Sequence, residues 1–308
     1  MKTKTITMFK LIAGSLCAGA LLLGSSSAHA QNIYVGDWVN VFQFSPGSGS
    51  FNQTTFSSGE DYARGLAFDS AGNLYEADCF SGQILEFKNN KGVLSSSAVV
   101  YASSLNNPGA IAFNKAGDLF VASDQANLIY EFAPGNNTPT IYDNTGLNSP
   151  QGLAFDTQGN LFVADWGNGT VTKITPQNVE STFATGLSNP VGLAFNSAGD
   201  LFVANAGANG YITEITPNGV QTTYATGLFD PQQIAFDGQG NLFVADSGDV
   251  ETDGDLTEIA PNGTETVIAS IPATLSVVVQ GQALPVPEPS SVALLALGAA
   301  GLLIRRRK

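Results

Sequence analysis

The sequence predicts an all-β fold, a six-bladed β-propeller built from four-stranded blades. A motif that reads GLAFDTQGNLFVAD at residues 152–165 recurs with small changes at 65–78, 110–123, 192–205 and 233–246. Successive copies are 45, 42, 40 and 41 residues apart, counted between Phe68, Phe113, Phe155, Phe195 and Phe236. A period of about 40 residues, with short apolar segments and glycine-containing turns, is typical of a propeller in which each repeat forms one blade.

Four short strands can be assigned within one repeat. They are predicted at 152–155, 161–164, 171–174 and 182–184. The first two are joined by a tight turn in which Gly159 is free to adopt a positive φ. The run LFVA at 161–164 is apolar at every position. This pattern indicates a strand that is buried on both faces between two neighbouring blades.

The two ends of the repeat region together supply the sixth blade. Residues 32–46 match residues 160–176, so the first copy starts at its second strand and lacks a first strand of its own. After the last full copy, TLSVVVQ at 274–280 takes the place of a first strand, and Val279 lies 43 residues after Phe236. We therefore expect residues 277–279 to pair with the N-terminal strand and close the ring, which leaves no gap between blades.

The repeat resembles the NHL repeat, and the resemblance extends over about residues 32–280. It implies membership of a superfamily of six-bladed propellers that includes strictosidine-synthase-like and gluconolactonase-like proteins. That superfamily contains lactonases, lyases and binding scaffolds, so the resemblance predicts the fold more sharply than the activity.

Residues 1–30 have the organisation of a secretory signal peptide. Lys2, Lys4 and Lys10 precede an apolar stretch, and residues 28–30 form a small-x-small cleavage site. We expect the mature, exported chain to begin near Gln31.

Residues 286–308 form a second targeting segment. The sequence Pro-Glu-Pro at 287–289 is followed by a 13-residue apolar run at 292–304 and by a basic end at 305–308. As a helix the run spans ~20 Å, which is short for a ~30 Å hydrocarbon core, and the basic end would stay on the cytoplasmic side. The segment resembles the PEP-CTERM sorting signal. This resemblance implies a Gram-negative bacterium that makes extracellular polysaccharide, and a transient inner-membrane anchor that an exosortase-type enzyme recognises. The alternative is an ordinary short tail anchor.

Charge and composition exclude several classes of function. The chain has 26 acidic and 12 basic residues; seven of the basic residues and one acid lie outside residues 31–285, which therefore carry 25 acids and 5 bases. So negative a surface disfavours nucleic acid as a partner. The one histidine, His29, lies in the signal peptide, which excludes histidine-based triads and histidine-ligated metal sites from the propeller. Cys79 is the single cysteine after residue 31, so no internal disulfide is expected.

The first set of candidate site residues lies at the mouth of the axial channel. We call the end of the ring that carries the loops between repeats the top face. Each repeat places one residue there, just before its predicted inner strand: Arg64, Gly109, Gln151, Val191, Gln232 and Leu275. Arg64 is the one cation of this set and could bind a carboxylate; the alternative is an ion pair with an acid such as Asp61. Gluconolactonase-like propellers carry a metal-ligating Asn where this chain has Gln151, so the resemblance does not carry that ligand over.

The second set ends the second strand of each blade: Asp37, Asp78, Ser123, Asp165, Asn205 and Asp246. Such residues accept hydrogen bonds from the following turn, so we interpret them first as structural. Trp38 and Trp166 each follow an Asp of this set, on the first and fourth blades. An exposed pair could stack a sugar or another flat ligand; the alternative is packing over the neighbouring blade. The predicted ligand-binding residues on the top face are Arg64, Gln151, Gln232, Trp38, Trp166, Asp37 and Asp165.

The third set is an acidic segment with four carboxylates, Asp249, Glu251, Asp253 and Asp255. Oxygen ligands at this spacing around a glycine suit a structural Ca²⁺; the alternative is a solvated acidic loop.

Glu76 is a further candidate, because it takes the place of a valine found in the other repeats. It is either a buried acid with a raised pKa or a partner of a basic side chain.

The leading functional hypothesis is an exported, monomeric, non-enzymatic propeller that binds a glycan or protein at the cell surface or in a polysaccharide matrix. The alternative is a Ca²⁺-dependent hydrolase of the gluconolactonase or strictosidine-synthase-like type, in which the metal polarises a carbonyl and Glu76 acts as base. A lyase is a weaker third hypothesis, because we expect it to need histidine.

Overall fold

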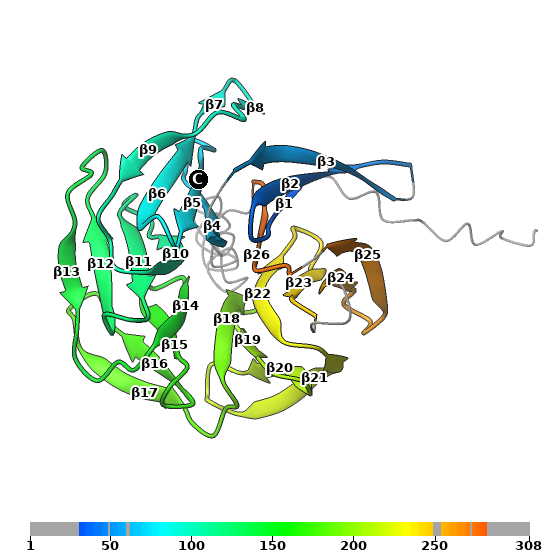
Figure 1. Ribbon diagram of the computed structural model, residues 1–308. Coiled ribbons are helices and arrows are strands. Elements are labelled where there is room, and N and C mark those ends of the chain that lie inside the picture. Colours follow the sequence, from blue (N-terminus) through cyan, green and yellow to red (C-terminus); the bar gives the residue numbers. More distant parts are fainter. Residues whose placement is uncertain (1–30, 49, 60–61, 249–253, 272, 282–308) are drawn as a thin grey trace, which may run out of the picture.

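Six four-stranded antiparallel sheets surround a central axis in a computed structural model of the chain (Figure 1). The structure describes residues 31–48, 50–59, 62–248, 254–271 and 273–281, and over these ranges it contains strands and no helix. Accordingly, the described part of the chain has no helix suited to crossing a membrane. The predicted all-β six-bladed propeller is confirmed.

Each blade runs from an inner strand at the axis to an outer strand at the rim. Blade 1 consists of β26 (Ser276–Val279), β1 (Ile33–Gly36), β2 (Asn40–Pro46) and β3 (Phe51–Ser58). Blade 2 consists of β4 (Ala63–Phe68), β5 (Leu74–Asp78), β6 (Gln83–Phe87) and β9 (Val99–Ala102), with a short outlying ribbon of β7 (Asn89–Asn90) and β8 (Val93–Leu94). Blade 3 consists of β10 (Pro108–Phe113), β11 (Leu119–Ser123), β12 (Leu128–Phe132) and β13 (Thr140–Asp143).

The remaining blades follow the same order. Blade 4 consists of β14 (Pro150–Phe155), β15 (Leu161–Asp165), β16 (Thr170–Ile174) and β17 (Glu180–Ala184). Blade 5 consists of β18 (Pro190–Phe195), β19 (Leu201–Asn205), β20 (Gly210–Ile215) and β21 (Gln221–Leu228). Blade 6 consists of β22 (Pro231–Phe236), β23 (Leu242–Asp246), β24 (Gly254–Ile259) and β25 (Glu265–Ile271).

The inner strands start earlier than the sequence pattern predicts. In blade 4 the predicted strand at 152–155 is extended by two residues, because Pro150 already pairs with Asp165 across a bulge. Arg64 and the equivalent residues of blades 3 to 6 are therefore the second residue of an inner strand rather than the residue before it. Leu275 alone lies before its strand. This corrects the predicted boundary and leaves the order of the mouth residues unchanged.

The ring is closed by the C-terminal strand, as predicted. β26 pairs antiparallel with β1, with Ile33 opposite Val279 and Val35 opposite Val277. One further main-chain bond extends the pairing at each end, from Leu275 N to Gly36 O (2.9 Å) and from Gln280 N to Asn32 O (2.8 Å). Both ends of the described chain thus lie in one blade, and residues 31–281 form a closed ring with its own cores.

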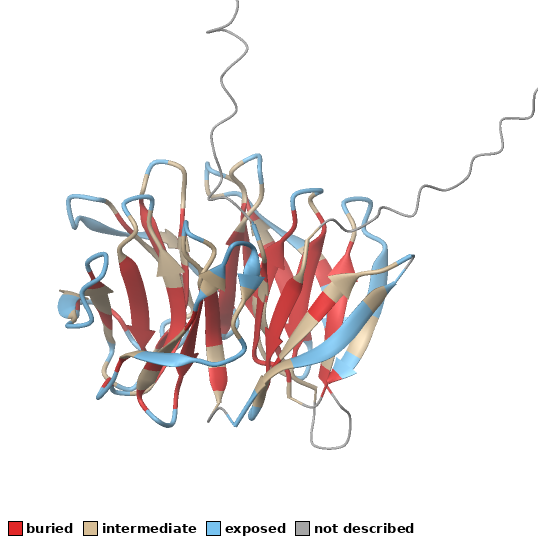
Figure 2. Cartoon of the chain, turned by 90° about the horizontal axis from the view of Figure 1, so that it is seen from above, coloured by how far each residue is buried: buried red, intermediate tan, exposed pale blue. Residues whose placement is uncertain are grey.

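The core lies between blades rather than within one sheet. In β15, Leu161 and Val163 pack towards blade 3, whereas Phe162 and Ala164 pack towards blade 5. Because successive side chains of a strand point to opposite faces, a strand between two blades needs apolar residues at every position. Figure 2 shows the result, with buried residues along the strands and exposed residues in the loops and at the rim.

Glycines let the inner strands approach one another at the axis. A Cβ at Gly152 would lie 1.8 Å from the carbonyl oxygen of Val191, and one at Gly192 would lie 2.3 Å from that of Gln232. At Gly65 the corresponding distance, to Gly109 O, is 2.4 Å. No side chain fits at these distances, so the glycines fix how closely the mouth residues of neighbouring blades can lie.

Replacing Val279 with Ala should lower the free energy of unfolding by about 2 kcal/mol, because Val279 is buried at the closure and its loss leaves a cavity. Val267→Ala, at a 56% exposed position of the outer strand β25, should change it by less than about 0.5 kcal/mol. Urea titrations monitored by circular dichroism measure both. Equal effects at the two sites would contradict a closing role for β26.

Candidate functional site

Three positions of every blade meet around the mouth of the channel on the top face. The turn position precedes the inner strand and has a positive φ in all six blades: Tyr62, Asn107, Ser149, Asn189, Asp230 and Ala273. The mouth position is held by Arg64, Gly109, Gln151, Val191, Gln232 and Leu275. The loop position follows the second strand: Trp38, Cys79, Asp124, Trp166, Ala206 and Ser247. Identical backbone positions thus carry different side chains, and these differences give the top face its chemistry.

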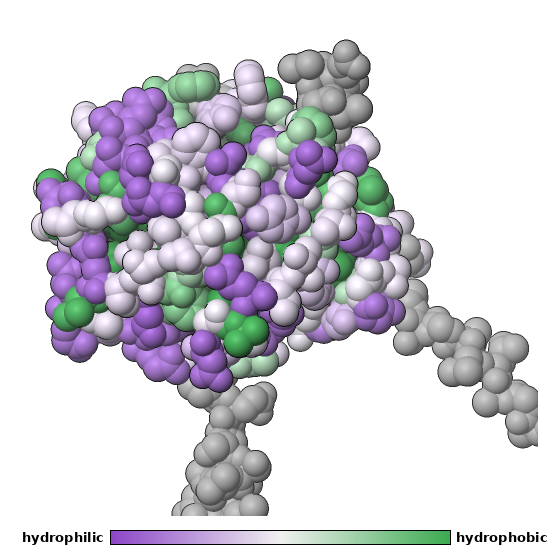
Figure 3. Space-filling model, turned by 90° about the horizontal axis from the view of Figure 1, so that it is seen from below, coloured by the Kyte–Doolittle hydropathy of each residue, from purple (hydrophilic) through white to green (hydrophobic). Residues whose placement is uncertain are grey.

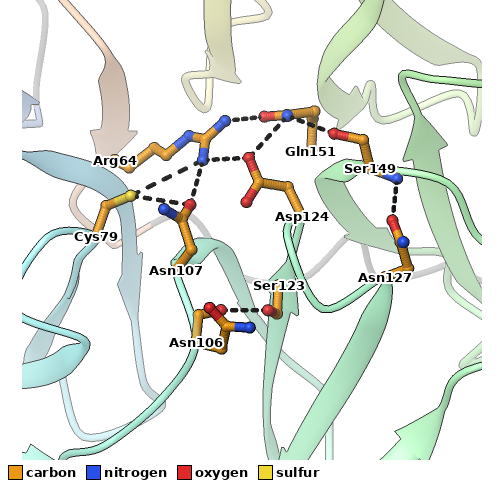
Figure 4. Close-up of polar contacts among 9 residues, drawn as sticks. All are labelled: Arg64, Cys79, Asn106, Asn107, Ser123, Asp124, Asn127, Ser149 and Gln151. Atoms are coloured by element: carbon orange, nitrogen blue, oxygen red, sulfur yellow. Dashed lines mark hydrogen bonds and ion pairs between the residues drawn. The ribbon is translucent and has the colours of Figure 1, made fainter.

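The Arg64 side chain reaches across blade 3. The mouth position of blade 3 is Gly109, where an added Cβ would already be in van der Waals contact with Arg64 Cδ, at 3.6 Å, so a side chain longer than that of alanine would compete for the space that Arg64 crosses. The guanidinium therefore lies against side chains of blades 3 and 4, with Cys79 of its own blade also close by (Figure 4).

Three side-chain oxygen atoms converge on this guanidinium. Arg64 Nη1 donates to Asp124 Oδ2 at 2.7 Å and to Asn107 Oδ1 at 3.1 Å, and Nη2 donates to Gln151 Oε1. Gln151 Nε2 in turn donates to Asp124 Oδ2 at 3.2 Å and to Ser149 Oγ at 3.3 Å. We call Arg64, Asn107, Asp124 and Gln151 the mouth network.

The mouth network is a charge-balanced and largely buried group. The side chains of Arg64 and Asp124 are 22% and 15% exposed. Burial alone would lower the pKa of Arg64, but the adjacent Asp124 carboxylate outweighs it and raises that pKa. Arg64 therefore pairs with Asp124, whereas Asp61, suggested by the sequence, lies outside the described residues.

Cys79 lies beside the mouth network without the properties of a nucleophile. Its Sγ donates to Asn107 Oδ1 at 3.1 Å and is 3.9 Å from Arg64 Nη1. Burial raises the pKa of the thiol despite the nearby guanidinium. Since the thiolate is the reactive form, this cysteine stays protonated and unreactive.

Gln232 belongs to a second polar cluster, in blade 6. Its Nε2 donates to Asp230 Oδ2 at 2.9 Å, and Ser247 Oγ donates to the same oxygen at 2.8 Å. Gly207 N donates to Asp230 Oδ1 at 2.9 Å. The structure therefore does not bring Gln232 into the mouth network.

The carboxylates that end the second strands serve the loops around them. Asp37 Oδ1 accepts from the N–H groups of Val39 and Asn40 at 2.7 and 2.6 Å. Asp165 Oδ1 accepts from Asn148 N at 2.6 Å, and its Oδ2 accepts from Asn168 Nδ2. Both side chains are buried, so they shape the loops and offer little to a ligand.

The two tryptophans differ in their surroundings. Trp38 on blade 1 is 56% exposed and contacts the ring of Tyr62, with centroids 5.6 Å apart. Tyr62 in turn contacts Phe80, which is 71% exposed, at 4.9 Å. Trp166 on blade 4 is 42% exposed and has no such aromatic neighbour among the described residues. Asp124, Tyr62 and Phe80 were not among the predicted site residues, although Asp124 occupies the same repeat position as the two tryptophans.

Glu76 lies within blade 2 rather than in the loops. It occupies the middle of β5, between Leu66 and Leu85 on the adjacent strands, and is completely buried. Glu76 lies on the same face of β5 as Leu74, because the two are two residues apart, and Leu74 packs in the core between blades 1 and 2. A position inside this core does not suit a base that must reach a substrate at the mouth.

The predicted Ca²⁺ ligands fall largely outside the described residues. Asp249, Glu251 and Asp253 lie there, whereas Asp255 is at the start of β24 and its Oδ1 accepts from Ser270 Oγ at 2.7 Å. Within the described ranges, no three His, Cys, Asp or Glu side chains are grouped closely enough to hold a metal ion. The Ca²⁺ site stays a prediction.

A cavity of about 500 Å³ lies away from the top face, between blades 4 and 5. Its lining includes Phe162, Phe183 and Phe195, which pack edge to face, and Lys173, whose ammonium lies 5.3 Å from the ring centre of Phe162. On the side of the ring that Figure 3 shows, apolar residues form small separate patches among polar ones.

Asp246→Asn should stabilise the protein at neutral pH. Burial raises the pKa of Asp246 to about 6, with Asp255 and Asp230 adding to the effect against the N–H groups of Phe229 and Gly248. The folded state therefore holds a proton that the unfolded state releases from about pH 4, and stability falls as pH rises through 4–6. At pH 7 the free energy of unfolding of the variant should exceed that of the wild type by on the order of 1 kcal/mol, and at pH 4 this difference should disappear.

The neighbouring blade shows that an amide fits this position. Asn205 accepts from Ser188 N at 3.2 Å and donates to Thr213 Oγ1 at 3.0 Å, and Thr257 is the equivalent of Thr213 in blade 6. Urea unfolding at pH 4 and pH 7 tests the prediction. If the free energies of unfolding of Asp246→Asn and the wild type differ by the same amount at both pH values, the prediction is wrong.

Comparisons with known proteins agree with this architecture. The family model described as NHL repeat matches residues 147–174, and the PEP-CTERM protein-sorting motif matches residues 285–308. No curated protein matches the chain. Among solved structures, a chain of a nidogen/laminin complex is similar with a TM-score of 0.69 and 18% identity, over 81% of this chain and 98% of that one.

Two enzymes share the fold at lower similarity. A streptogramin B lyase has a TM-score of 0.54 and 14% identity, over 79% of this chain and 74% of its own. A gluconolactonase from Xanthomonas campestris has a TM-score of 0.58 and 15% identity, over 68% of this chain and 76% of its own. At these identities the likeness shows the fold and not the activity. The chain is a six-bladed β-propeller that carries an NHL repeat and ends in a PEP-CTERM protein-sorting motif, which marks it as an exported protein.

Proposed function

We propose that the chain is a surface-sorted, non-enzymatic binding module that displays its top face, within an extracellular polysaccharide matrix of a Gram-negative bacterium. The proposal is supported most directly by the mouth network. Asp124 Oδ2, Asn107 Oδ1 and Gln151 Oε1 all accept hydrogen bonds from Arg64. Oxygen atoms that converge in this way suit a cation, and here the cation is a guanidinium supplied by the protein itself.

The alternative, a Ca²⁺-dependent hydrolase, needs a divalent ion at the same place. The residues at the mouth do not fit one, because the Arg64 guanidinium lies 2.7 Å from Asp124 Oδ2 and would repel a second cation. The likeness to a gluconolactonase concerns the fold alone. With the Asp124 carboxylate paired to Arg64 and Glu76 inside a core, the described residues of the mouth do not fit the metal-and-base arrangement that this alternative requires.

The route to the surface follows from the two ends of the sequence. Residues 1–30 would direct export, and residues 286–308 would hold the protein briefly in the inner membrane for an exosortase-type enzyme. Membrane contact through the C-terminal segment alone leaves the propeller free as a monomer outside the cell.

Arg64→Ala should convert the mouth into a weak divalent-cation site. The substitution leaves Asp124 buried without its partner, so the free energy of unfolding should fall by about 2 kcal/mol. Added Ca²⁺ should raise the thermal midpoint of this variant more than that of the wild type, because the three oxygen atoms lose the guanidinium to which they all bond. In the double variant Arg64→Ala with Asp124→Asn, the destabilisation and the Ca²⁺ response should both be smaller. A Ca²⁺ response equal to that of the wild type would contradict this account of the mouth.

The absence of hydrolysis is tested on residues 31–285. We expect no turnover of aldonolactones or aryl esters with Ca²⁺, Mn²⁺ or a chelator present, measured by proton release and by chromophore release. Metal-dependent turnover that is lost in Asp124→Asn would overturn the proposed function and favour the hydrolase.

We propose, further, that the acidic segment binds a structural Ca²⁺. The double substitution Asp253→Asn and Asp255→Asn should lower the thermal midpoint in Ca²⁺ and leave it unchanged in chelator, because bound Ca²⁺ stabilises only the folded form. Differential scanning calorimetry in the two buffers measures this. Equal shifts in both buffers would remove the metal from the account.

A further inference from the structure

Three aromatic side chains from two blades form a continuous exposed strip beside the channel mouth. We call Trp38, Tyr62 and Phe80 the aromatic arc. Ring centroids are 5.6 Å apart for Trp38 and Tyr62, and 4.9 Å apart for Tyr62 and Phe80. The two outer members are 56% and 71% exposed. The contacts are tilted, at 57° and 46°, so the rings support one another while their outer faces stay open to solvent.

The backbone is arranged to hold these rings in place. Tyr62 N donates to Trp38 O at 3.0 Å, and Cys79 N donates to Tyr62 O at 3.2 Å, so the turn before β4 is bonded to the loops of both blades. Tyr62 is therefore bonded through its main chain to Trp38 and to Cys79, the residue before Phe80.

Tyr62 is unusual at its position. All six turn positions have a positive φ, between 51° and 80°. The other five are held by Asn, Asp, Ser or Ala, whereas a bulky aromatic residue is rarely found there, because its side chain crowds the backbone. Tyr62 has the highest φ of the six, 80°. Backbone strain of this kind persists where the side chain has a use, and here the side chain joins Trp38 to Phe80.

We propose that the aromatic arc binds an uncharged polysaccharide, with sugar rings stacked on Trp38 and Phe80. This inference rests on the proposed binding function and names its ligand class. The apolar face of a pyranose ring suits an exposed aromatic face, and the amides and hydroxyls at the mouth suit its hydroxyl groups.

Charge favours an uncharged ligand over the other classes. Residues 31–285 carry 25 acids and 5 bases, so they repel a uronate, sulfated or phosphorylated polymer. A basic peptide would need open carboxylates beside the arc. Among the described residues, the carboxylates next to Trp38 and Phe80 in the sequence, Asp37 and Asp78, are buried and accept hydrogen bonds from the backbone of their own loops. Glu60 and Asp61 precede Tyr62 and lie outside the described residues, so the lysine-rich peptide below is the probe for them. The Asp124 carboxylate is paired with Arg64.

The test uses residues 31–285 and four probes: cellohexaose, N-acetylchitohexaose, hexagalacturonate and a lysine-rich peptide. Trp38 and Trp166 are the two tryptophans of the chain, so in Trp166→Phe the fluorescence emission comes from Trp38 alone. We expect a neutral hexasaccharide to change this emission on binding and hexagalacturonate to leave it unchanged.

Trp38→Ala and Phe80→Ala should weaken binding at least about tenfold by calorimetry. Ile141→Ala is the control, because it removes an apolar side chain that is 57% exposed on the outer strand β13, and its affinity should be that of the wild type.

Tyr62→Asn separates binding from folding. Asparagine tolerates this backbone conformation, as Asn107 and Asn189 show at the equivalent positions, so the thermal midpoint should not fall. Binding should nevertheless weaken, because the link between the outer rings is lost.

No binding of either neutral hexasaccharide below about 1 mM, or equal affinity in Trp38→Ala and the wild type, would overturn the inference. Binding of hexagalacturonate or the peptide in place of the neutral sugars would also overturn the inference. None of these results contradicts the proposed binding function, which is overturned only by observed turnover.

Discussion

Pairing between β26 and β1 brings together two segments that are separated by about 240 residues of sequence, and every other blade depends on it. Without β26, blade 1 would lack its inner strand, and the cores it shares with blades 2 and 6 would be open to water. The valines of β26 fill those cores, with Val277 and Val279 buried towards blade 6. Closure therefore combines main-chain hydrogen bonds with apolar burial, and it removes the free strand edges that an open ring would present.

Closure also determines which side chains can meet at the channel mouth. Once the ring is complete, inner-strand glycines let neighbouring strands approach until a carbonyl oxygen fills the space of a side chain. A long residue at one mouth position then reaches the next two blades if the residue between is small. Arg64 does so over Gly109, and it meets Asp124 and Gln151 there. The mouth network is thus a consequence of ring geometry together with one glycine.

Repetition made the fold predictable, and departures from repetition limited the prediction of the site. The period, the apolar LFVA strands and the C-terminal valines all follow from burial on both blade faces, so blade number and closure could be inferred before any coordinates. The partner of Arg64 could not, because choosing Asp124 over Asp61 requires knowing that the side chain crosses blade 3. The arc was missed for a related reason. The repeat relates Trp38 to Trp166, whereas the neighbour of Trp38 in space, Tyr62, belongs to the next blade and to a different repeat position.

The departures are not spread evenly around the ring. At the three top-face positions blade 5 has Asn189, Val191 and Ala206, which contribute neither charge nor an aromatic ring. Blades 1 to 4 contribute the aromatic arc and the mouth network, which are adjacent because Arg64 follows Tyr62 by two residues. The ring of equivalent backbone positions therefore has a sector, in blades 1 to 4, where open aromatic faces lie beside a network of hydrogen-bonded polar groups, and a separate polar cluster around Asp230 in blade 6. Such a sector suits a ligand that is held by contact area and weak hydrogen bonds.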